Sequence, residues 1–161
     1  MSSLLIKPCY SVSLDSVEDF GPNPGQLDMF VYVPDDYEQD AAMVVALHGC
    51  RQQATDFDDE TGLKAYADSL KFVLLFPEQR LSNNDNQCFN WFEPKNNSKH
   101  QGESGSIKNM ILYAIDTYGV SPTKIFILGL SAGGSMAAVL IANYPQMFGG
   151  GAIIAGTPYN C

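Results

Sequence analysis

The sequence predicts an α/β fold with a mostly parallel sheet and flanking helices. Short, continuous apolar runs suit strands that are buried on both faces, and they occur at Met43–Leu47, Phe72–Phe76 and Ile125–Leu128. Segments between these runs carry apolar residues at helical spacing. Buried strands that alternate with amphipathic helices indicate a parallel sheet with right-handed crossovers.

The elements can be assigned in order along the chain. Strands are expected at Met29–Val33, Met43–Leu47, Phe72–Phe76 (closed by Pro77), Ile125–Leu128 and Gly151–Ala155. Helices are expected at Phe57–Leu70 (apolar positions Leu63, Tyr66, Ala67 and Leu70), Ser106–Tyr118 and Ser135–Asn143. The stretch from Leu81 to Gly102 is rich in Asn, Gln and Ser and predicts a long surface loop. Turn residues at Gly21–Gly25 mark where order begins, so residues 1–26 are expected to be a partly irregular segment and 27–161 a partial domain.

Composition excludes several classes of function. The net charge is −9 with only nine Lys and Arg, which argues against a nucleic-acid partner. No apolar run reaches the roughly 18 residues of a membrane span, and Met1–Lys7 turns polar too early for a signal-peptide core. The cysteines Cys9, Cys50, Cys88 and Cys161 lack CxxC spacing, so a zinc site is not expected. Three disulfide pairings are open, and the sequence does not choose among them.

The end of the chain has an unusual composition. After Lys124 there is no Asp, Glu, Lys, Arg or His. Such a stretch reads as buried interior, because charged residues dominate solvated faces. Since a domain does not stop within its own core, we expect an incomplete domain. The Gly151–Ala155 strand would then be an open, apolar sheet edge, where self-association or a complementing chain is expected.

The motif Gly129-Leu130-Ser131-Ala132-Gly133 carries the chemistry. It matches G-x-S-x-G and stands directly after a predicted strand and before a helix, which is the context that the motif requires. The glycines allow a sharp turn that lifts the serine hydroxyl over the sheet edge. Ser131 is therefore the predicted nucleophile of a serine hydrolase. The alternative is a glycine-rich helix entry with Ser131 as a cap.

A second loop supplies candidate oxyanion-hole donors. His48-Gly49-Cys50 follows the Met43–Leu47 strand, and in this architecture that loop donates one backbone N–H, together with the residue after the nucleophile. The predicted donors are Cys50 (Gly49 is the alternative) and Ala132. His48 precedes the nucleophile, whereas the order in such hydrolases is serine, acid, histidine. A structural role in supporting this loop is therefore favoured for His48 over that of catalytic base.

For the other candidate functional residues, a structural interpretation is available. His100 lies among polar residues and is read as a solvated loop histidine. The acidic run Asp56, Asp58, Asp59 and Glu60 suits a helix start rather than a metal site. Trp91, with its neighbours Phe89 and Phe92, could line a substrate cleft or pin the loop onto the sheet, and both readings stay open.

The predicted loops should meet at one edge of the sheet. Each follows the carboxyl end of a strand, where ligands bind in open α/β sheets. The segments concerned are His48–Cys50, Pro77–Gln79, Gly129–Gly133 and Gly156–Thr157.

Six sequence blocks, in the same order, resemble the polyhydroxybutyrate-depolymerase-like esterases, relatives of feruloyl and acetylxylan esterases. The blocks are Phe20–Gly25, Leu47–Gln52, Phe76–Gln79, Cys88–Phe92, Gly129–Gly134 and Gly150–Gly156. The resemblance implies an α/β-hydrolase fold, no cofactor, and ester hydrolysis through an acyl-serine intermediate. It assigns Ser131 as nucleophile and Cys50 with Ala132 as oxyanion donors. It also implies export and a disulfide among Cys50, Cys88 and Cys161.

The sequence departs from this family in one respect. In the family the catalytic acid and histidine lie beyond the position that matches Cys161, and nothing after Ser131 here is Asp, Glu or His. A serine without a base is a poor nucleophile at neutral pH, so we expect the chain alone to be nearly inactive. The competing hypothesis is a non-catalytic remnant or binding subunit that another chain completes.

Overall fold

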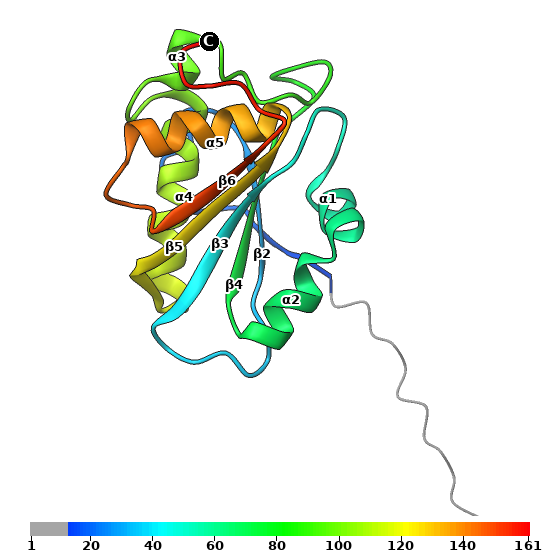
Figure 1. The fold of residues 1–161 in the computed structure, drawn as a ribbon, viewed down its shortest axis with the longest axis vertical. Coiled ribbons are helices and arrows are strands. Elements are labelled where there is room, and N and C mark those ends of the chain that lie inside the picture. Colours follow the sequence, from blue (N-terminus) through cyan, green and yellow to red (C-terminus); the bar gives the residue numbers. More distant parts are fainter. Residues whose placement is uncertain (1–12) are drawn as a thin grey trace, which may run out of the picture.

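A six-stranded sheet organises the fold (Figure 1). The computed structural model describes residues 13–161. In sheet order the strands are β1 (Asp15–Val17), β2 (Asp28–Tyr32), β4 (Val73–Glu78), β3 (Ala41–Leu47), β5 (Val120–Leu130) and β6 (Gly150–Ile154). The helices are α1 (Ala54–Thr61), α2 (Leu63–Leu70), α3 (Pro94–Asn97), α4 (Gly102–Tyr118) and α5 (Ala132–Asn143).

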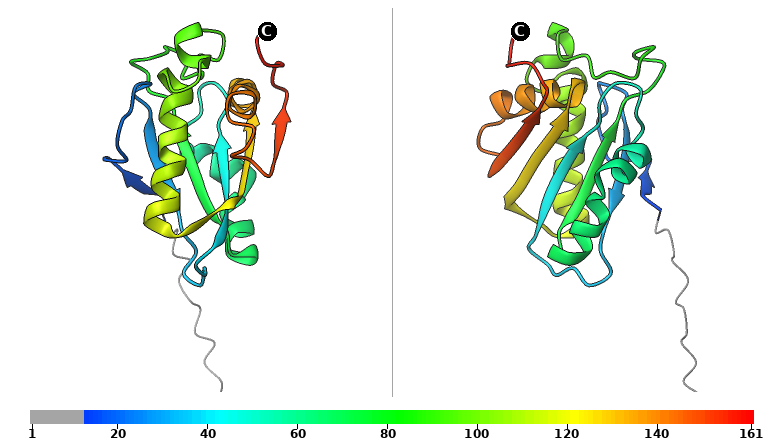
Figure 2. Two further views of the ribbon diagram at one scale, coloured as in Figure 1. Left: turned by 90° about the vertical axis from the view of Figure 1, so that its left-hand side faces the viewer. Right: turned by 45° about the vertical axis from the view of Figure 1, so that its right-hand side comes forward.

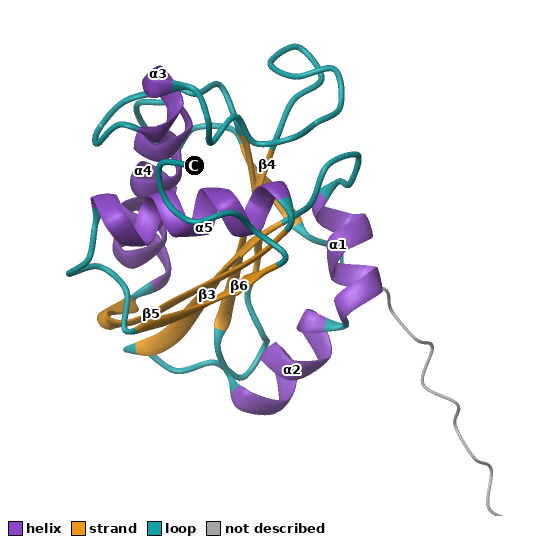
Figure 3. Cartoon of the chain, turned by 45° about the horizontal axis from the view of Figure 1, so that its top comes forward, coloured by secondary structure: helices purple, strands orange, loops and turns teal. Residues whose placement is uncertain are grey.

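The predicted α/β class with a mostly parallel sheet is confirmed. Strands β4, β3, β5 and β6 run parallel to their neighbours within this group, and β1 and β2 add an antiparallel edge. Strand β3 lies between β4 and β5, and its last three residues are buried. The carboxyl ends of the parallel strands therefore meet at one edge, where their following loops gather (Figure 3).

Helices cover both faces of the sheet (Figure 2). On one face α4 and α5 enclose the larger core, to which they contribute Ile107, Met110, Ile111, Met136 and Leu140. On the other face α1 and α2 enclose a smaller core around Phe57, Ala67, Leu74 and Phe76. The apolar side chains at the centres of both cores are buried. Removal of this apolar surface from water is the main source of folding free energy.

The single helix expected over Phe57–Leu70 is wrong, because the chain forms two helices there. Gly62 takes a left-handed conformation (φ 67°), closes α1 and precedes α2. Because the chain forms two helices, the apolar residues of the expected single helix do not form one buried stripe. Tyr66 and Leu70 are 61% and 68% exposed, and Ala67 is the buried residue of α2.

Several element bounds differ from those expected. Pro77 lies inside β4 opposite Met29 instead of ending the strand. The ladder from β4 to β3 covers only Val73–Leu75, so a residue without an N–H is tolerated beyond it. The predicted Leu81–Gly102 loop contains the short helix α3, and α4 begins at Gly102 rather than Ser106. Strand β1 falls within the N-terminal segment 1–26.

The uncharged end of the chain is buried only in part. From Ala132 to Leu140, every residue of α5 is buried, as expected. Strand β6 is exposed instead: the exposed fractions of Ile153 and Ile154 are 47% and 51%. The expectation of a buried stretch is therefore wrong for β6, and this strand forms the apolar outer edge of the sheet in Figure 2.

No helix within residues 13–161 combines the length and apolar character needed to cross a bilayer.

The turn from β5 to α5 packs directly against the end of β3. A Cβ atom on Gly133 would lie 2.2 Å from the Leu47 carbonyl oxygen, and one on Gly129 would lie 2.2 Å from the Gly133 carbonyl oxygen. Backbone atoms occupy the space that side chains would need. Gly133 therefore permits the close contact between this turn and β3, and Gly129 permits the tight turn itself.

Replacing Gly133 with alanine should destabilise the fold, because neither backbone can move away without disturbing the sheet. We expect Gly133→Ala to lower the free energy of unfolding by about 1–3 kcal/mol or more, measured by urea denaturation. Gly150→Ala is the matched control, since its Cβ would meet only the Phe126 ring at 3.6 Å, an ordinary contact. Equal stability of the two variants would contradict this account of the turn.

Candidate active site

Ser131 lies at the sharpest point of the β5–α5 turn. Its backbone has φ 54° and ψ −118°, a combination that non-glycine residues adopt only under constraint. The Ser131 N–H donates to the Ile154 carbonyl at 2.8 Å, and the Ser131 carbonyl accepts from the Ser135 N–H at 3.0 Å. The residue is exposed, and within residues 13–161 its hydroxyl has no hydrogen-bond partner. This is the geometry that the G-x-S-x-G motif predicts for a nucleophile.

The loop after β3 approaches Ser131 closely. A Cβ atom built on Gly49 would lie 3.6 Å from the Ser131 Cβ. Among the described residues, the backbone N–H groups of Cys50 and Ala132 donate no hydrogen bond, as is usual for the first residue of a helix such as Ala132. The structure thus brings together the serine and the segments that carry both expected oxyanion donors.

His48 is buried beneath this loop (1% exposed), and its ring packs at 4.8 Å from the Phe89 ring. The Gln79 N–H donates to His48 Nε2 at 3.1 Å, so Nε2 carries no proton. The ring proton is therefore on Nδ1, which lies 2.6 Å from the Gly49 carbonyl oxygen and donates to it. Burial lowers the pKa of His48 and keeps the ring neutral. With both ring nitrogens occupied, His48 supports the loop and has no nitrogen free to act as base.

Two further links hold the Gly49–Cys50 segment. The Gly49 N–H donates to Gln52 Oε1 at 2.7 Å. A disulfide joins Cys50 to Cys88 in the loop after β4. Cys161 is exposed and has no disulfide partner in the described part of the chain, and Cys9 lies outside the described residues. The resemblance thus named the right group of cysteines, and the pair within it is Cys50–Cys88.

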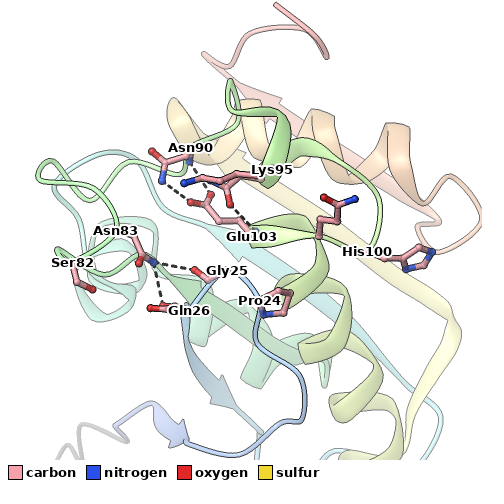
Figure 4. A pocket seen from close by; sticks show the side chains of 12 residues that line it. Pro24, Gly25, Gln26, Ser82, Asn83, Asn90, Lys95, His100 and Glu103 are labelled. Atoms are coloured by element: carbon pink, nitrogen blue, oxygen red, sulfur yellow. Dashed lines mark hydrogen bonds between the residues drawn. The ribbon is translucent and has the colours of Figure 1, made fainter.

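A polar cavity of about 460 Å³ lies between the β4–α4 connection and the turn before β2 (Figure 4). Glu103 lies at its base and is 1% exposed. Its carboxylate accepts from Gln79 Nε2 (2.7 Å), the Asn90 N–H (2.8 Å) and Asn90 Nδ2 (2.7 Å). Burial raises the pKa of Glu103, while these hydrogen bonds lower it. A buried carboxylate without a cationic partner is stabilised here by neutral amide donors.

The side-chain amides of Asn83, Asn90 and Asn96 at this cavity are hydrogen-bonded within the protein. Asn83 Nδ2 donates to the carbonyl oxygens of Gly25 and Gln26 and to Gln79 Oε1. Asn96 Oδ1 accepts from the Glu103 N–H at 3.2 Å, and Asn96 Nδ2 donates to Glu93 at 2.7 Å. A ligand would have to break these bonds. The cluster therefore fixes the loops rather than offering a binding site.

Sequence reasoning missed Glu103, Gln52 and the role of the Gln79 side chain. Gln79 stands at the carboxyl end of a strand with the other site segments, and both Gln52 and Gln79 lie in blocks of the family resemblance, but neither signal assigns a role to the side chain. Glu103 lies at the predicted boundary between a surface loop and a helix, and it is separated from Gln79 by 24 residues. Neither burial nor that pairing can be seen in the local pattern.

The aromatic candidates lie in different environments. Phe89 is fully buried, Trp91 packs half-buried against the larger core, and Phe92 is 56% exposed. Trp91 and Phe92 meet edge to face at 5.2 Å. Trp91 is thus placed to pin the loop, and its role in a substrate cleft stays a prediction.

The remaining candidates are not part of the site. His100 is exposed, its ring meets Tyr144 at 5.7 Å, and its N–H donates to the Tyr144 hydroxyl. In the acidic run, Asp56 lies in the first turn of α1, and buried Asp58 pairs with Lys64 at 2.9 Å. No group of three His, Cys, Asp or Glu in residues 13–161 could hold a metal ion.

The neutral, buried His48 should make stability depend on pH. An unfolded histidine takes up a proton near pH 6.5, whereas folded His48 does so only at lower pH. The free energy of unfolding should therefore be full above about pH 6.5 and fall by up to about 1.4 kcal/mol per pH unit as pH decreases below it. Glu103, with its raised pKa, acts in the opposite direction in this range.

The measurement is urea denaturation of the wild type and His48→Phe between about pH 7.5 and 5. Because both proteins contain Glu103, their difference isolates the histidine. We expect the gap in stability to narrow as pH falls. A gap that is independent of pH would show that His48 does not titrate differently in the folded state.

Comparison with known proteins identifies the family. The family model described as esterase PHB depolymerase matches residues 27–160. Poly(3-hydroxyalkanoate) depolymerase C from Paucimonas lemoignei is 44% identical over 149 residues, which make up 92% of this chain and 36% of that protein. Feruloyl esterase B from Talaromyces funiculosus is 34% identical over 158 residues, or 98% of this chain and 44% of that protein.

A solved structure agrees with these matches. Acetyl xylan esterase from Aspergillus awamori superposes with a TM-score of 0.87 and 28% identity, over 92% of this chain and 54% of that one. The chain thus spans between about a third and half of the length of these relatives. The matches confirm the resemblance inferred from the six blocks, and the chain belongs to the esterase PHB depolymerase family of carboxylic ester hydrolases.

Proposed function

We propose that this chain carries the nucleophile and the oxyanion hole of a serine esterase that acts through an acyl-serine intermediate. The observation that carries the proposal is Ser131 in its constrained turn, beside a loop whose Cys50 N–H is unpaired among the described residues. Membership of an esterase family supports the same reaction.

In this mechanism the Ser131 hydroxyl oxygen attacks the ester carbonyl carbon. The carbonyl oxygen gains negative charge and is stabilised by the N–H groups of Cys50 and Ala132, each such donor being worth about 2.7–4 kcal/mol of barrier. Collapse of the tetrahedral intermediate expels the alcohol, and water then hydrolyses the acyl-serine. No step requires a cofactor.

The proton of Ser131 needs a base, and within residues 13–161 the Ser131 hydroxyl has no hydrogen-bond partner. His48 is occupied at both nitrogens, and no Asp, Glu or His follows Ser131. We propose that the acid and histidine come from a further segment that docks on this domain, and that the chain alone is nearly inactive.

The relatives suggest the substrate class. Their names point to polyhydroxyalkanoate, feruloyl and acetylxylan esters, and we propose an ester of this group. The Cys50–Cys88 disulfide supports export to an oxidising compartment. Trp91, beside exposed Phe92, is the proposed contact for the substrate.

Hydrolysis of p-nitrophenyl butyrate tests the proposal. The 161-residue chain alone should hydrolyse the ester no faster than Ser131→Ala, because no base is present. The wild type is then mixed or co-expressed with the C-terminal part of the Paucimonas lemoignei depolymerase, meaning the part that follows its matched region. This mixture should gain an activity at least about 10³-fold higher than that of the same mixture with Ser131→Ala.

The matched control is Ser69→Ala, an exposed serine on α2, which should keep the full activity. Turnover by the chain alone that depends on Ser131 would contradict the missing base. Failure of every complemented sample, despite formation of the complex, would favour the non-catalytic binding subunit instead.

We also propose that β6 is where the further segment pairs. Its register with β5 places Ile154 beside Leu130 and Ala152 beside Leu128, on the face that carries the smaller core. Phe126 continues this surface and is 40% exposed. An edge strand with exposed apolar side chains on its face is a template for another strand.

Substituting Ile154 with lysine should weaken docking, because it places a charge on this apolar surface. Loss of about 1.5–3 kcal/mol of burial free energy corresponds to roughly 10- to 150-fold weaker binding of the C-terminal part of the relative, measured by sedimentation velocity. Leu70→Lys, at a leucine on α2 that is 68% exposed, should bind as the wild type does. If the wild-type chain instead forms a dimer that Ile154→Lys abolishes, the edge pairs with a second copy.

A further inference from the structure

Gln79 connects the structures on both sides of the oxyanion loop. It follows β4, is 0% exposed, and every polar group of its side chain is paired. Side-chain Nε2 donates to the Cys88 carbonyl (3.1 Å) and to Glu103 Oε1 (2.7 Å). Side-chain Oε1 accepts from the Arg80 N–H (3.0 Å) and Asn83 Nδ2 (2.9 Å). The amide is thereby fixed in one orientation.

One route from Gln79 to Cys50 runs through the backbone. The Gln79 N–H donates to His48 Nε2, which directs the ring proton on Nδ1 to the Gly49 carbonyl oxygen. The Gly49 carbonyl and the Cys50 N–H belong to the same peptide plane, and in a trans peptide they point in opposite directions. Holding the carbonyl against His48 therefore turns the Cys50 N–H away from the core.

The other route runs through the side chain. By binding the Cys88 carbonyl, the Gln79 side chain closes the loop that follows β4, and Cys88 is joined to Cys50 by the disulfide. The Arg51 N–H, which donates to the Asn86 carbonyl at 2.8 Å, ties the two loops together at a neighbouring point. The peptide before Cys50 and the Cys50 side chain are thus each held by a group that Gln79 binds: His48 for the peptide and Cys88 for the side chain.

We propose that Gln79 is a positioning residue for the oxyanion hole, which holds the Gly49–Cys50 peptide so that the Cys50 N–H faces the oxygen of the substrate. The proposal rests on the proposed role of Cys50 as an oxyanion donor. Gln79 touches neither the substrate nor Ser131, and it acts through His48 and Cys88. Its value to the reaction is preorganisation, because a donor that is already oriented needs no rearrangement as charge develops.

The hydrogen-bond pattern explains why glutamine is required at this position. Glu103 and the Cys88 carbonyl are acceptors, so they require the NH₂ group, while the Arg80 N–H requires the oxygen. A glutamate of the same shape would place an oxygen against two acceptors, one of them a buried carboxylate. Gln79→Glu should therefore displace residue 79 and release His48 and Cys88.

The experiment is NMR on the resting 161-residue chain with ¹⁵N label. In the wild type we expect His48 as the Nδ1–H tautomer and a rigid Cys50 amide, with an order parameter of about 0.85. In Gln79→Glu we expect loss of the single tautomer and a Cys50 order parameter below about 0.6. Gln87→Glu is the matched control, since it makes the same chemical change in the same loop, and the Gln87 side chain has no hydrogen bond among the described residues.

Gln79→Met is measured alongside, because it removes the same hydrogen bonds without adding a charge. A folded Gln79 variant with a wild-type His48 tautomer and a rigid Cys50 amide would overturn the proposal. A wild-type His48 that carries its proton on Nε2 would overturn it as well, whether or not the variants fold. Neither readout involves turnover. If the chain gives the expected spectra but no complemented sample hydrolyses an ester despite formation of the complex, the proposed function is contradicted, while the orientation of the Cys50 N–H by Gln79 stays supported.

Discussion

The site depends on how closely the β5–α5 turn packs against the end of β3. Backbone atoms of the two segments approach so closely that residue 133 has no space for a Cβ atom. This contact places Ser131 beside Gly49, and therefore beside the loop that carries Cys50. The unusual backbone of Ser131 is tolerated because hydrogen bonds fix the chain on both sides, to Ile154 of β6 and to Ser135 of α5. A looser turn would relax the serine and separate it from the oxyanion loop.

Around this contact, hydrogen bonds between buried polar groups hold the segments in place, whereas apolar packing does so in the rest of the fold. His48, Gln79 and Glu103 are all at least 99% buried, and each has its hydrogen bonds satisfied by protein groups. Burying such a network costs the desolvation free energy of its polar groups. Its hydrogen bonds, however, fix the orientation of the groups that they join, which apolar contacts do not. The peptide between Gly49 and Cys50 needs a defined orientation, and hydrogen bonds to fixed partners provide it.

Much of the fold follows from local patterns, because strands buried on both faces are continuous apolar runs. For this reason β3 and β4 were found within two residues at each end, and α5 follows directly from the glycine-rich motif. The sequence does not predict the break at Gly62, because the helical spacing of apolar residues continues across it. In the structure Tyr66 and Leu70 are exposed, so these two apolar positions do not pack in a core. Ser131 was found because its motif is local. The Gln79–Glu103 pair was not, because polar residues in an Asn-rich stretch look solvated until the fold encloses them.

The two edges of the sheet have different chemistry. On one side, β1 has only three residues, and two of them, Asp15 and Ser16, are exposed and polar. A short strand with a carboxylate discourages further pairing. On the other side, β6 is longer and apolar. The two edges therefore differ in how they would receive a further strand. In the docking that we propose, the added strand pairs with β6, whose Ile154 carbonyl accepts from the Ser131 N–H, so the sheet would be extended on the same side as the nucleophile.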